Sequence, residues 1–479
     1  MFELREALGW LSAGRLYGDG AVRMGGVSTD TRRIAPGDLF VALRGERFDA
    51  HDFVGQAQRA GAAAVLFDRW VPGVRLPAIQ VADSRRALGE LAAGWRARFA
   101  LPLVAVTGSN GKTTVKEMIS AILVERFGQA HRLATRGNLN NDVGVPLTLL
   151  RLREEHRAAV VELGTNHPGE VAWLARIAQP TVALVTNAQR EHQEFLDGAE
   201  GSARENGAAI AALGAEGIAV FPGDDAQAPL WRALAGARRC IEFGLQSDAG
   251  GSGHDGPGGG HGGAAVEPGR AARFAVQAAA DARPQRFMLE LPDARVEVAL
   301  AIDGAHNVRN ALAAAACAHA LGIDGATIAA GLARFRPAVG RLARLRAPGG
   351  AVLIDDSYNA NPDSVRAAID VLAACEARRV LVLGDMGEVG ARGPQFHREV
   401  GEYARERGVT HLLALGEACS GAVAAFGAGG EHFETLEALL ERARGLCDAA
   451  TVLLVKGSRF MRMERVVAAL AGAPAGEHA

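Results

Sequence analysis

One glycine-rich segment constrains this chain more than any other feature. Residues 107–114 read Thr-Gly-Ser-Asn-Gly-Lys-Thr-Thr and follow the apolar residues 101–106. A strand, a glycine turn and a helix in this order place backbone N–H groups around a phosphate, and the glycines allow its close approach. Lys112 then offers a positive charge to the outer phosphates, and Thr113 offers a hydroxyl to Mg²⁺. The segment predicts a nucleotide-binding phosphate loop.

The spacing within this loop narrows the class of nucleotide. The spacing from Gly108 to Lys112 is shorter than in the common form of the motif, which favours a subset of ATP enzymes over small GTPases. A chance Gly-Lys-Thr in a surface loop is the alternative, and the flanking apolar run and helix-compatible residues 115–124 argue against it. The expected ATP-binding residues of the loop are Gly108, Ser109, Asn110, Gly111, Lys112, Thr113 and Thr114.

Length and composition exclude several other classes of protein. The 479 residues suffice for roughly three domains, and a hydrophobic content of 49% predicts large buried cores. A net charge of −2 with scattered Lys and Arg indicates no nucleic-acid partner. Uncharged apolar runs are too short for a membrane span. The N-terminus does not resemble a signal peptide, and the five cysteines lie far apart, so we expect a cytoplasmic protein with reduced thiols.

Short strands and helices alternate along the chain, which predicts an α/β fold of three domains. Residues 1–98 form the expected first domain, in which residues 22–27 are predicted to form a strand. Residues 99–333 begin with the phosphate loop, and their continuous apolar strands between helices indicate a parallel sheet covered on both faces. Residues 334–479 alternate four strands with helices, as in a doubly wound, Rossmann-like domain.

The glycine-rich residues 247–269 interrupt the second domain. They hold too few apolar side chains to order themselves, so we expect a flexible surface insertion there. Metal binding by His254 and His261 is the alternative for this segment.

Polar residues follow two strands of the expected parallel sheet, at the edge where such sheets bind ligands. Glu162 ends the strand that begins at Ala158. A carboxylate there, beside a phosphate loop, is a candidate Mg²⁺ ligand, with a surface glutamate as the alternative. His192 follows the strand that ends near Thr186 and is weak evidence for a site by itself.

Further polar clusters lie between elements. Asn138, Asn140 and Asn141 occupy one amide-rich loop, which suits ligand hydrogen bonding, although asparagines also shape ordinary turns. Four more clusters start a helix or follow a strand, and each could be only a helix cap and turn. Their occurrence together favours a binding cleft. They span residues 303–310, 355–364, 384–390 and 456–459.

These motifs together resemble the Mur ligase family, the ATP-dependent amino-acid ligases of peptidoglycan precursor synthesis. The resemblance covers nearly the whole chain. It implies a small N-terminal α/β domain for a UDP-linked substrate, a central P-loop ATPase domain and the C-terminal Rossmann-like domain, in that order. The residues that carry it are the phosphate loop, Glu162, His192, Asn307, Asn310, Gly340, Arg341 and Asp356.

Within the family, the chain looks like the branch that adds D-alanyl-D-alanine. Residues 359–362 and 384–388 carry that likeness, and residues 28–32 and 45–51 are similar to the branch's UDP-substrate domain. The Asp-Asn-Pro-Arg signature of the diaminopimelate- or lysine-adding branch is absent. The implied reaction joins D-Ala-D-Ala to UDP-N-acetylmuramoyl-tripeptide through an acyl phosphate, releasing ADP and phosphate.

The resemblance also implies roles for single residues, in an enzyme expected to be a monomer. Lys112, with Mg²⁺ held by Thr113 and Glu162, neutralises charge during phosphoryl transfer. His192 holds a second Mg²⁺. The residues implied to bind ATP outside the loop are Asn307 and Asn310 (adenine), Asp356 (ribose) and Arg341 (phosphates). Those implied to bind the other substrates are Ser28, Thr31, Arg32, Phe48, Asp49, His51, Asn138, Asn140, Asn141, Asn359, Asn361 and Asp385.

One position departs from the family pattern. Many members carry a carbamylated lysine that helps bind the second Mg²⁺, and this position falls on Asn206, whose amide cannot be carbamylated. We hypothesise that the neighbouring Glu205 supplies the missing negative oxygen as a catalytic residue. The alternative is that Glu205 is a helix-surface residue and the second metal is held more loosely.

Three other functions compete with this interpretation. A folylpolyglutamate synthase-like ligase shares the phosphate loop but lacks a domain equivalent to residues 1–98. A regulatory ATPase of the P-loop class leaves the clusters at Asp356 and Asp385 unexplained. Intact Lys112, Glu162 and His192 argue against the third, an inactive scaffold. Within the ligase interpretation itself, another amino-acid ligase of the Mur family is the alternative.

Overall fold

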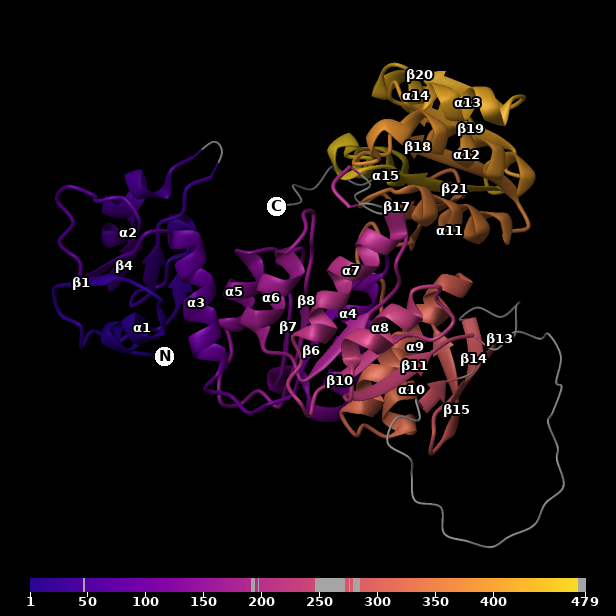
Figure 1. Cartoon of the computed structure of the whole chain (residues 1–479). Helices are drawn as coiled ribbons and strands as arrows, with labels where there is room; N and C mark the ends of the chain where they lie inside the picture. Colours follow the sequence, from indigo (N-terminus) through magenta and orange to yellow (C-terminus); the bar gives the residue numbers. More distant parts are fainter. Residues whose placement is uncertain are drawn as a thin grey trace, which may run out of the picture.

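The computed structural model describes residues 1–45, 48–190, 194–196, 198–245, 272–274, 276–278 and 285–472. The expected insertion at 247–269 and the candidate metal ligand His192 lie outside these residues. Four sheets organise the described residues, in a mixed α/β architecture that confirms the predicted fold class (Figure 1). No helix within the described ranges is long and apolar enough to cross a membrane.

The N-terminal sheet has five strands in the order β1-β5-β4-β3-β2, with only β1 antiparallel to its neighbour. The strand expected at 22–27 is shorter than predicted, because only its last residue pairs in β2. The strands are β1 (Arg15–Tyr17), β2 (Val27–Ser28), β3 (Leu39–Val41), β4 (Ala64–Phe67) and β5 (Ala78–Gln80), and the α-helices are α1 (Leu4–Trp10), α2 (Val54–Arg59) and α3 (Ser84–Arg96).

The central sheet is parallel throughout, as predicted, in the order β12-β11-β10-β9-β6-β8-β7. Its strands are β6 (Leu103–Thr107), β7 (Arg132–Ala134), β8 (Ala158–Glu162), β9 (Val182–Val185), β10 (Ile218–Pro222), β11 (Arg239–Phe243) and β12 (Ala272–Phe274). Its helices are α4 (Lys112–Phe127), α5 (Gly144–Leu149), α6 (Glu170–Ala178), α7 (Gly198–Ala211), α8 (Ala228–Ala235), α9 (Ala305–Ala320) and α10 (Gly325–Arg334). A small antiparallel sheet joins β13 (Val276–Ala278), β14 (Gln285–Glu290) and β15 (Arg295–Leu300).

The C-terminal sheet has six strands in the order β16-β17-β21-β18-β19-β20, all parallel except β16. Its strands are β16 (Ala343–Arg346), β17 (Val352–Asp356), β18 (Arg378–Gly384), β19 (His411–Leu415), β20 (Gly430–Phe433) and β21 (Thr451–Lys456). Its helices are α11 (Pro362–Ala373), α12 (Gly393–Glu406), α13 (Ser420–Phe426), α14 (Leu436–Gly445) and α15 (Glu464–Ala471).

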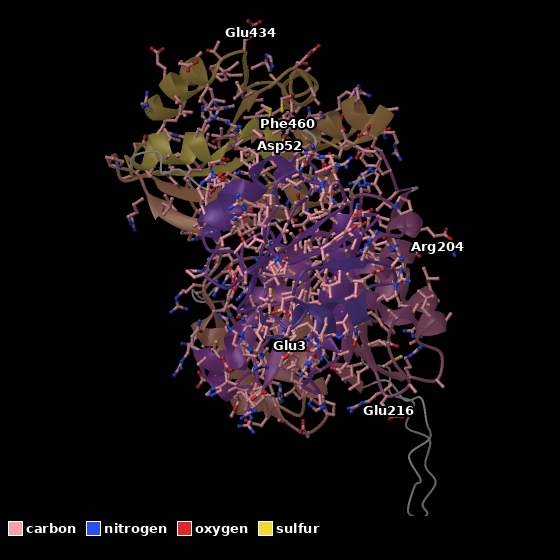
Figure 2. The ribbon with its side chains drawn as sticks, turned by 90° about the vertical axis from the view of Figure 1, so that its left-hand side faces the viewer. Glu3, Asp52, Arg204, Glu216, Glu434 and Phe460 are labelled. Carbon is pink, nitrogen blue, oxygen red and sulfur yellow. The ribbon has the colours of Figure 1, made fainter. Side chains whose placement is uncertain are left out.

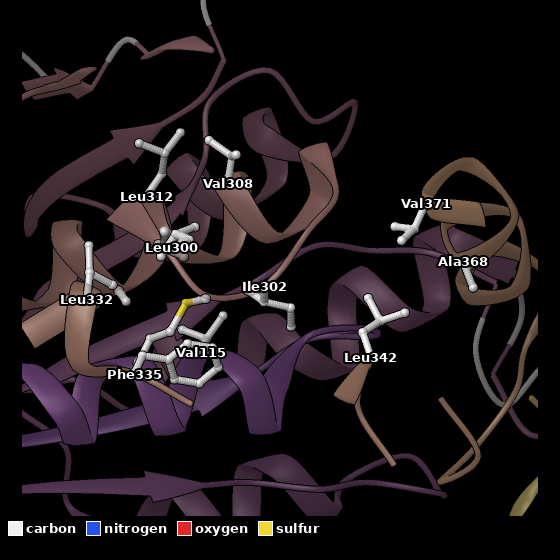
Figure 3. Close-up of a cluster of buried hydrophobic side chains, with 14 of the residues drawn as sticks. Val115, Leu300, Ile302, Val308, Leu312, Leu332, Phe335, Leu342, Ala368 and Val371 are labelled. Atoms are coloured by element: carbon white, nitrogen blue, oxygen red, sulfur yellow. The ribbon is translucent and has the colours of Figure 1, made fainter. Parts of the chain in front are cut away.

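The two faces of the central sheet bury different cores, because successive side chains of a strand point to opposite faces. Val104 and Val106 of β6 join a core with α4, α9 and α10, part of which Figure 3 shows. Leu103 and Ala105 join a second core that includes Leu88 of α3, so the N-terminal unit packs on this face. The boundaries predicted after residues 98 and 333 remain proposals.

Helix α10 approaches α4, the helix that begins at the phosphate loop, closely at Gly331. A Cβ atom at Gly331 would lie 2.5 Å from Cα of Ile122, whereas one at Gly9 in α1 would meet no atom within 4 Å. Alanine is otherwise the better helix residue by roughly 0.5–1 kcal/mol. The two glycines therefore separate packing from helix propensity.

We expect Gly331→Ala to lower the free energy of unfolding by about 1–3 kcal/mol, because α10 must move away from α4. The control, Gly9→Ala, is expected to leave stability equal or to raise it by up to roughly 1 kcal/mol. Thermal unfolding of both variants measures the difference. An unchanged or raised stability of Gly331→Ala would contradict the close approach of the two helices.

Candidate active site

A cavity of about 1080 Å³ opens where the phosphate loop faces the C-terminal sheet. Ser109 to Thr113 form one wall, and residues 358–361 after β17 form the opposite wall. The cavity extends to the start of α3, where Arg85 and Arg86 line it. The carboxyl ends of strands from two sheets thus meet at one cavity, as expected for ligand binding in parallel α/β folds.

The phosphate loop has the backbone that the sequence predicts. Gly108 and Gly111 have φ angles of +124° and +85°, in the region that side chains rarely adopt. A Cβ atom at Gly108 would also lie 2.1 Å from Oγ1 of Thr186, so only glycine fits there. Asn187, after β9, accepts a hydrogen bond from the Asn110 N–H at 2.9 Å and donates one to the Asn110 carbonyl at 3.0 Å.

Lys112 opens helix α4 with its ammonium group turned back over the loop. Nζ donates to the carbonyl oxygens of Gly108 at 2.6 Å and Ser109 at 3.1 Å. These contacts keep the positive charge above the backbone N–H groups of the turn, where a phosphate anion would bind.

Glu162 ends β8 as a buried carboxylate with only 2% of its surface exposed. Its Oε1 accepts hydrogen bonds from Oγ1 of Thr113 at 3.1 Å and Nδ2 of Asn140 at 2.9 Å. In the part of the chain that the structure describes, its Oε2 is buried with no hydrogen-bond partner. A buried anionic oxygen beside a threonine hydroxyl fits a Mg²⁺ ion, which prefers hard oxygen ligands.

Asn206 of α7 holds the start of the phosphate loop. Its buried Oδ1 accepts hydrogen bonds from Oγ1 of Thr107 at 2.5 Å and the Gly108 N–H at 2.8 Å. Its Nδ2 donates to the Ser202 carbonyl at 2.8 Å, which sets the amide's orientation. Asn206 thus fixes the residue at which the loop leaves its strand.

Glu205, the neighbour of Asn206, caps the first turn of α6. Its Oε2 accepts from the Gly169 N–H at 2.7 Å, and its Oε1 accepts from the Val171 N–H at 2.8 Å. Both oxygens are therefore engaged at a helix N-terminus, where a carboxylate is favourable. The hypothesis that Glu205 supplies an oxygen to a metal stays a prediction.

The start of helix α9 lies beside the phosphate loop. Oδ1 of Asn310 would be 2.4 Å from a Cβ atom at Gly111, and Nδ2 of Asn310 donates to Oδ1 of Asn307 at 3.0 Å. Burial lowers the pKa of the preceding His306 to about 4, so its ring is neutral near pH 7 and can accept a hydrogen bond. Its Nε2 lies 3.0 Å from Nδ2 of Asn307.

The C-terminal wall is tied directly to the phosphate loop. Nδ2 of Asn361 donates to Oδ1 of Asn110 at 2.9 Å. Arg190 adds a charged contact between the same two units, because its guanidinium contacts Asp363 at 2.6 Å and Glu399 at 2.8 Å. The C-terminal unit is thus held against the central one.

Two further charged residues of this wall have well-defined partners. Nη2 of Arg341 lies 3.5 Å from Oγ1 of Thr113, a residue of the phosphate loop. Asp356 forms a buried ion pair with Lys456 at 2.5 Å, in which Lys456 also donates to the Asn359 carbonyl at 3.0 Å.

Comparison with known proteins identifies the family. The description "Mur ligase middle domain" matches residues 106–318, "Mur ligase, glutamate ligase domain" matches residues 340–459, and "Mur ligase family, catalytic domain" matches residues 23–96. The UDP-N-acetylmuramoyl-tripeptide–D-alanyl-D-alanine ligase of Escherichia coli K12 is 41% identical over 451 residues, which cover 94% of each chain. The chain belongs to the Mur ligase family.

Other members of the family agree over almost the same length. The Bacillus subtilis protein of the same name is 34% identical, over 94% of this chain and 93% of its own. MurF from Acinetobacter baumannii superposes with a TM-score of 0.86 at 34% identity, covering 98% of this chain and 99% of its own. MurF ligase from Thermotoga maritima in complex with ADP has a TM-score of 0.78 at 25% identity, with coverages of 94% and 97%.

The structure brings many of the predicted residues of this Mur ligase to one cavity. It does not bring Gly108, Thr114, Asn138, Glu205, Asn307, Asn310, Asp356 or Asp385 to the cavity lining, although several support residues that are there. Asp385, for example, accepts a hydrogen bond from the Cys419 N–H at 2.8 Å. The predicted residues that line the cavity are Ser109, Asn110, Gly111, Lys112, Thr113, Asn140, Asn141, Glu162, Arg341, Asn359 and Asn361.

The candidates for the UDP-linked substrate lie in the N-terminal unit and outside this cavity. Asp49 accepts a hydrogen bond from the His51 N–H at 3.0 Å, and Phe48 is 73% exposed. Arg32 pairs with Asp30 at 2.8 Å. Their roles stay predictions, as do those of Ser28 and Thr31.

Sequence reasoning about this Mur ligase missed the contacts of Asn206 and Arg190. The sequence shows only that the Asn206 amide cannot be carbamylated. Nothing in the spacing indicates that Asn206 binds Gly108, 98 residues away in the sequence. Arg190 and Asp363 are 173 residues apart, so no local pattern connects them. The one sequence signal for Arg190 and Asp363 is position, since each comes after a strand, at the ligand-binding edge of a sheet.

We expect Asn206→Ala to raise the KM for ATP about tenfold, because the Gly108 N–H and the Thr107 hydroxyl lose their acceptor. Thr107→Val, which removes only one of the two hydrogen bonds, is expected to have a smaller effect. The double variant should resemble Asn206→Ala, because both changes act on one oxygen. Steady-state kinetics with ATP measures all three, and additive effects would contradict the shared role.

Glu205→Gln keeps the shape of the side chain and removes its charge. If Glu205 supplies an oxygen to the second Mg²⁺, we expect a lower kcat and a requirement for more Mg²⁺. If it only caps α6, we expect a modest loss of stability of about 1 kcal/mol and an unchanged Mg²⁺ dependence. Titration of activity with Mg²⁺, together with thermal unfolding, separates the two outcomes.

Proposed function

We propose that this Mur ligase joins D-alanyl-D-alanine to UDP-N-acetylmuramoyl-tripeptide with ATP, giving the pentapeptide precursor of peptidoglycan, ADP and phosphate. The observation that carries the proposal is the cavity that the phosphate loop shares with residues 358–361 of the C-terminal unit. The match to the named ligases over 94% of the chain supports the same conclusion.

In the first step, the terminal carboxylate of the tripeptide attacks the γ-phosphate, and ADP leaves. Phosphoryl transfer depends mainly on positioning and on charge neutralisation. Lys112 provides a cation over the loop, and Arg341 provides another within 3.5 Å of Thr113. The product is an acyl phosphate, whose carbonyl carbon is activated for attack.

Thr113 and the Glu162 oxygen that has no hydrogen-bond partner among the described residues would hold Mg²⁺ here. When bound, Mg²⁺ would neutralise negative charge on the phosphate oxygens during phosphoryl transfer. We keep His192 as the proposed ligand of a second Mg²⁺.

In the second step, the amine of D-Ala-D-Ala attacks the acyl carbon, and inorganic phosphate leaves. Water would hydrolyse the acyl phosphate, so the site must exclude it during the reaction. The contacts of Asn361 with Asn110 and of Arg190 with Asp363 close the C-terminal unit over the phosphate loop and support this requirement.

We further propose that the enzyme works in the cytoplasm as a monomer. Both facing walls of the cavity, the phosphate loop and residues 358–361, come from this chain, which is consistent with a monomeric enzyme.

Phosphate release tests the function, measured with ATP, Mg²⁺ and UDP-N-acetylmuramoyl-tripeptide, with and without D-Ala-D-Ala. We expect release only with both substrates, together with pentapeptide detected by mass. Lys112→Ala is expected to lower kcat by at least about 100-fold, because it removes a cation aimed at the transferred phosphate. The control is Arg126→Ala, an exposed arginine at the far end of the same helix.

Two outcomes would overturn the proposal. Release with a single amino acid but not the dipeptide would indicate another branch of the family. Release with neither acceptor would indicate a plain ATPase.

A further inference from the structure

The dipeptide of the proposed reaction is a zwitterion, and this inference rests on that proposed function. Its carboxyl group ionises near pH 3.5, so it carries a negative charge at neutral pH. A buried or half-buried carboxylate needs a cationic partner, and an arginine fork matches its geometry. The wall that receives the dipeptide should therefore present an arginine or a lysine.

Six cationic side chains line the cavity among the described residues, and most have another assignment. Lys112 and Arg341 contact the phosphate loop. Lys456 is buried in its ion pair with Asp356. Arg85 and Arg86 belong to α3, and Arg85 pairs there with Asp142. Arg459, the sixth, follows β21 on the C-terminal wall, where it pairs with Glu464 at 2.9 Å, and 54% of its side chain remains exposed to the cavity side and solvent.

Arg459 and Arg341 both lie near the aromatic ring of Tyr358. The guanidinium carbon of Arg459 is 5.8 Å from the centre of the Tyr358 ring. The guanidinium carbon of Arg341 is 4.2 Å from the same ring centre. Arg341 in turn reaches Thr113 of the phosphate loop. A dipeptide spans at most roughly 7 Å, so with its carboxylate at Arg459 its amine can extend toward Arg341 and the phosphate loop.

The backbone that carries Arg459 is held in place by Ser458. The Ser458 hydroxyl accepts a hydrogen bond from the Gly387 N–H at 2.7 Å and donates to the Ala360 carbonyl at 3.1 Å. The Ser458 N–H donates to the Asp385 carbonyl at 3.1 Å. Loops after β17, β18 and β21 are thereby joined, so Arg459 projects from a defined position. The exposed ring of Phe460 follows it directly (Figure 2).

The same wall carries a carboxylate in an unusual backbone conformation. Glu388, in the loop after β18, lines the cavity with a φ angle of +58°. A residue other than glycine is strained in this region, and such strain often accompanies a functional site. Glu388 adds a negative charge to the wall on which Arg459 is positive. One charge of each sign matches the two ends of a zwitterion.

We propose that Arg459 binds the carboxylate of D-Ala-D-Ala and that Glu388 attracts its ammonium group. Arg459 is thus a specificity-determining residue that selects an acceptor with a free C-terminal carboxylate. Glu388 orients the amino end of the dipeptide, whose nitrogen is the atom that attacks the acyl carbon.

The test compares D-Ala-D-Ala with D-alanyl-D-alaninamide, which lacks the negative charge. We expect the wild-type enzyme to prefer the free acid in kcat/KM by about 10- to 100-fold, the range for a hydrogen-bonded charge. Arg459→Gln should lose most of this preference while its KM for ATP stays unchanged. Glu388→Gln should raise the KM for D-Ala-D-Ala severalfold and keep the preference for the acid.

Two controls separate binding from folding. Glu464→Gln breaks the 2.9 Å ion pair of Arg459 but keeps the guanidinium, so the preference for the acid should remain. Arg462→Gln changes a nearby exposed arginine that does not line the cavity, and it should behave like the wild type. A structural role for Arg459 predicts instead that Glu464→Gln and Arg459→Gln lose activity toward both acceptors equally.

Several results would overturn this inference without touching the proposed function. If Arg459→Gln makes pentapeptide with an unchanged preference for the acid, another group binds the carboxylate. If the wild type uses the amide as well as the acid, no cationic side chain recognises the C-terminal carboxylate of the dipeptide. An unchanged KM in Glu388→Gln removes Glu388 from the site. Failure of the wild type to use D-Ala-D-Ala at all would instead overturn the function itself.

Discussion

The buried carboxylate of Glu162 is the point on which the arrangement of the cavity depends. A charge with 2% exposure is costly unless polar partners compensate it. Thr113 and Asn140 supply hydrogen bonds to one of its oxygens, and these bonds fix the start of α4 and the amide-rich loop relative to β8. Its second oxygen has no hydrogen-bond partner among the described residues, which favours a cation there. The carboxylate thus positions the protein groups around it and leaves one coordination position for a metal.

The central part of the fold was predictable because its signals are local. An apolar run, a glycine turn and a helix are contiguous, so residues 103–127 could be assigned without knowing their neighbours. The parallel strands were recognisable for the same reason, since burial on both faces makes them continuously apolar. One strand was predicted to be longer than it is, because its local signal is weak. Near residues 22–27 the apolar content suggests a longer strand, but only Val27 and Ser28 pair in the sheet.

The remaining part of the site depends on contacts between distant segments. Spacing located Glu205 and Asn206 on one helix but could not show which way each side chain points. The structure turns Asn206 toward the phosphate loop and Glu205 toward the start of α6. Neighbouring residues on a helix point about 100° apart, so a contact assigned to the wrong neighbour is given to a side chain that faces another part of the structure. The ion pair of Lys456 with Asp356 is likewise set by the pairing of β21 with β17, which the sequence does not encode locally.

The hydrogen bond between Asn110 and Asn361 has a thermodynamic consequence. Asn110 belongs to the loop that receives the nucleotide, and Asn361 belongs to the wall that receives the acceptor. Whatever free energy of coupling passes through this contact must be reciprocal. If bound nucleotide raises the affinity for the dipeptide by some factor, the dipeptide raises the affinity for the nucleotide by the same factor. Two substrates that do not react directly with each other can therefore be linked through a pair of side-chain amides.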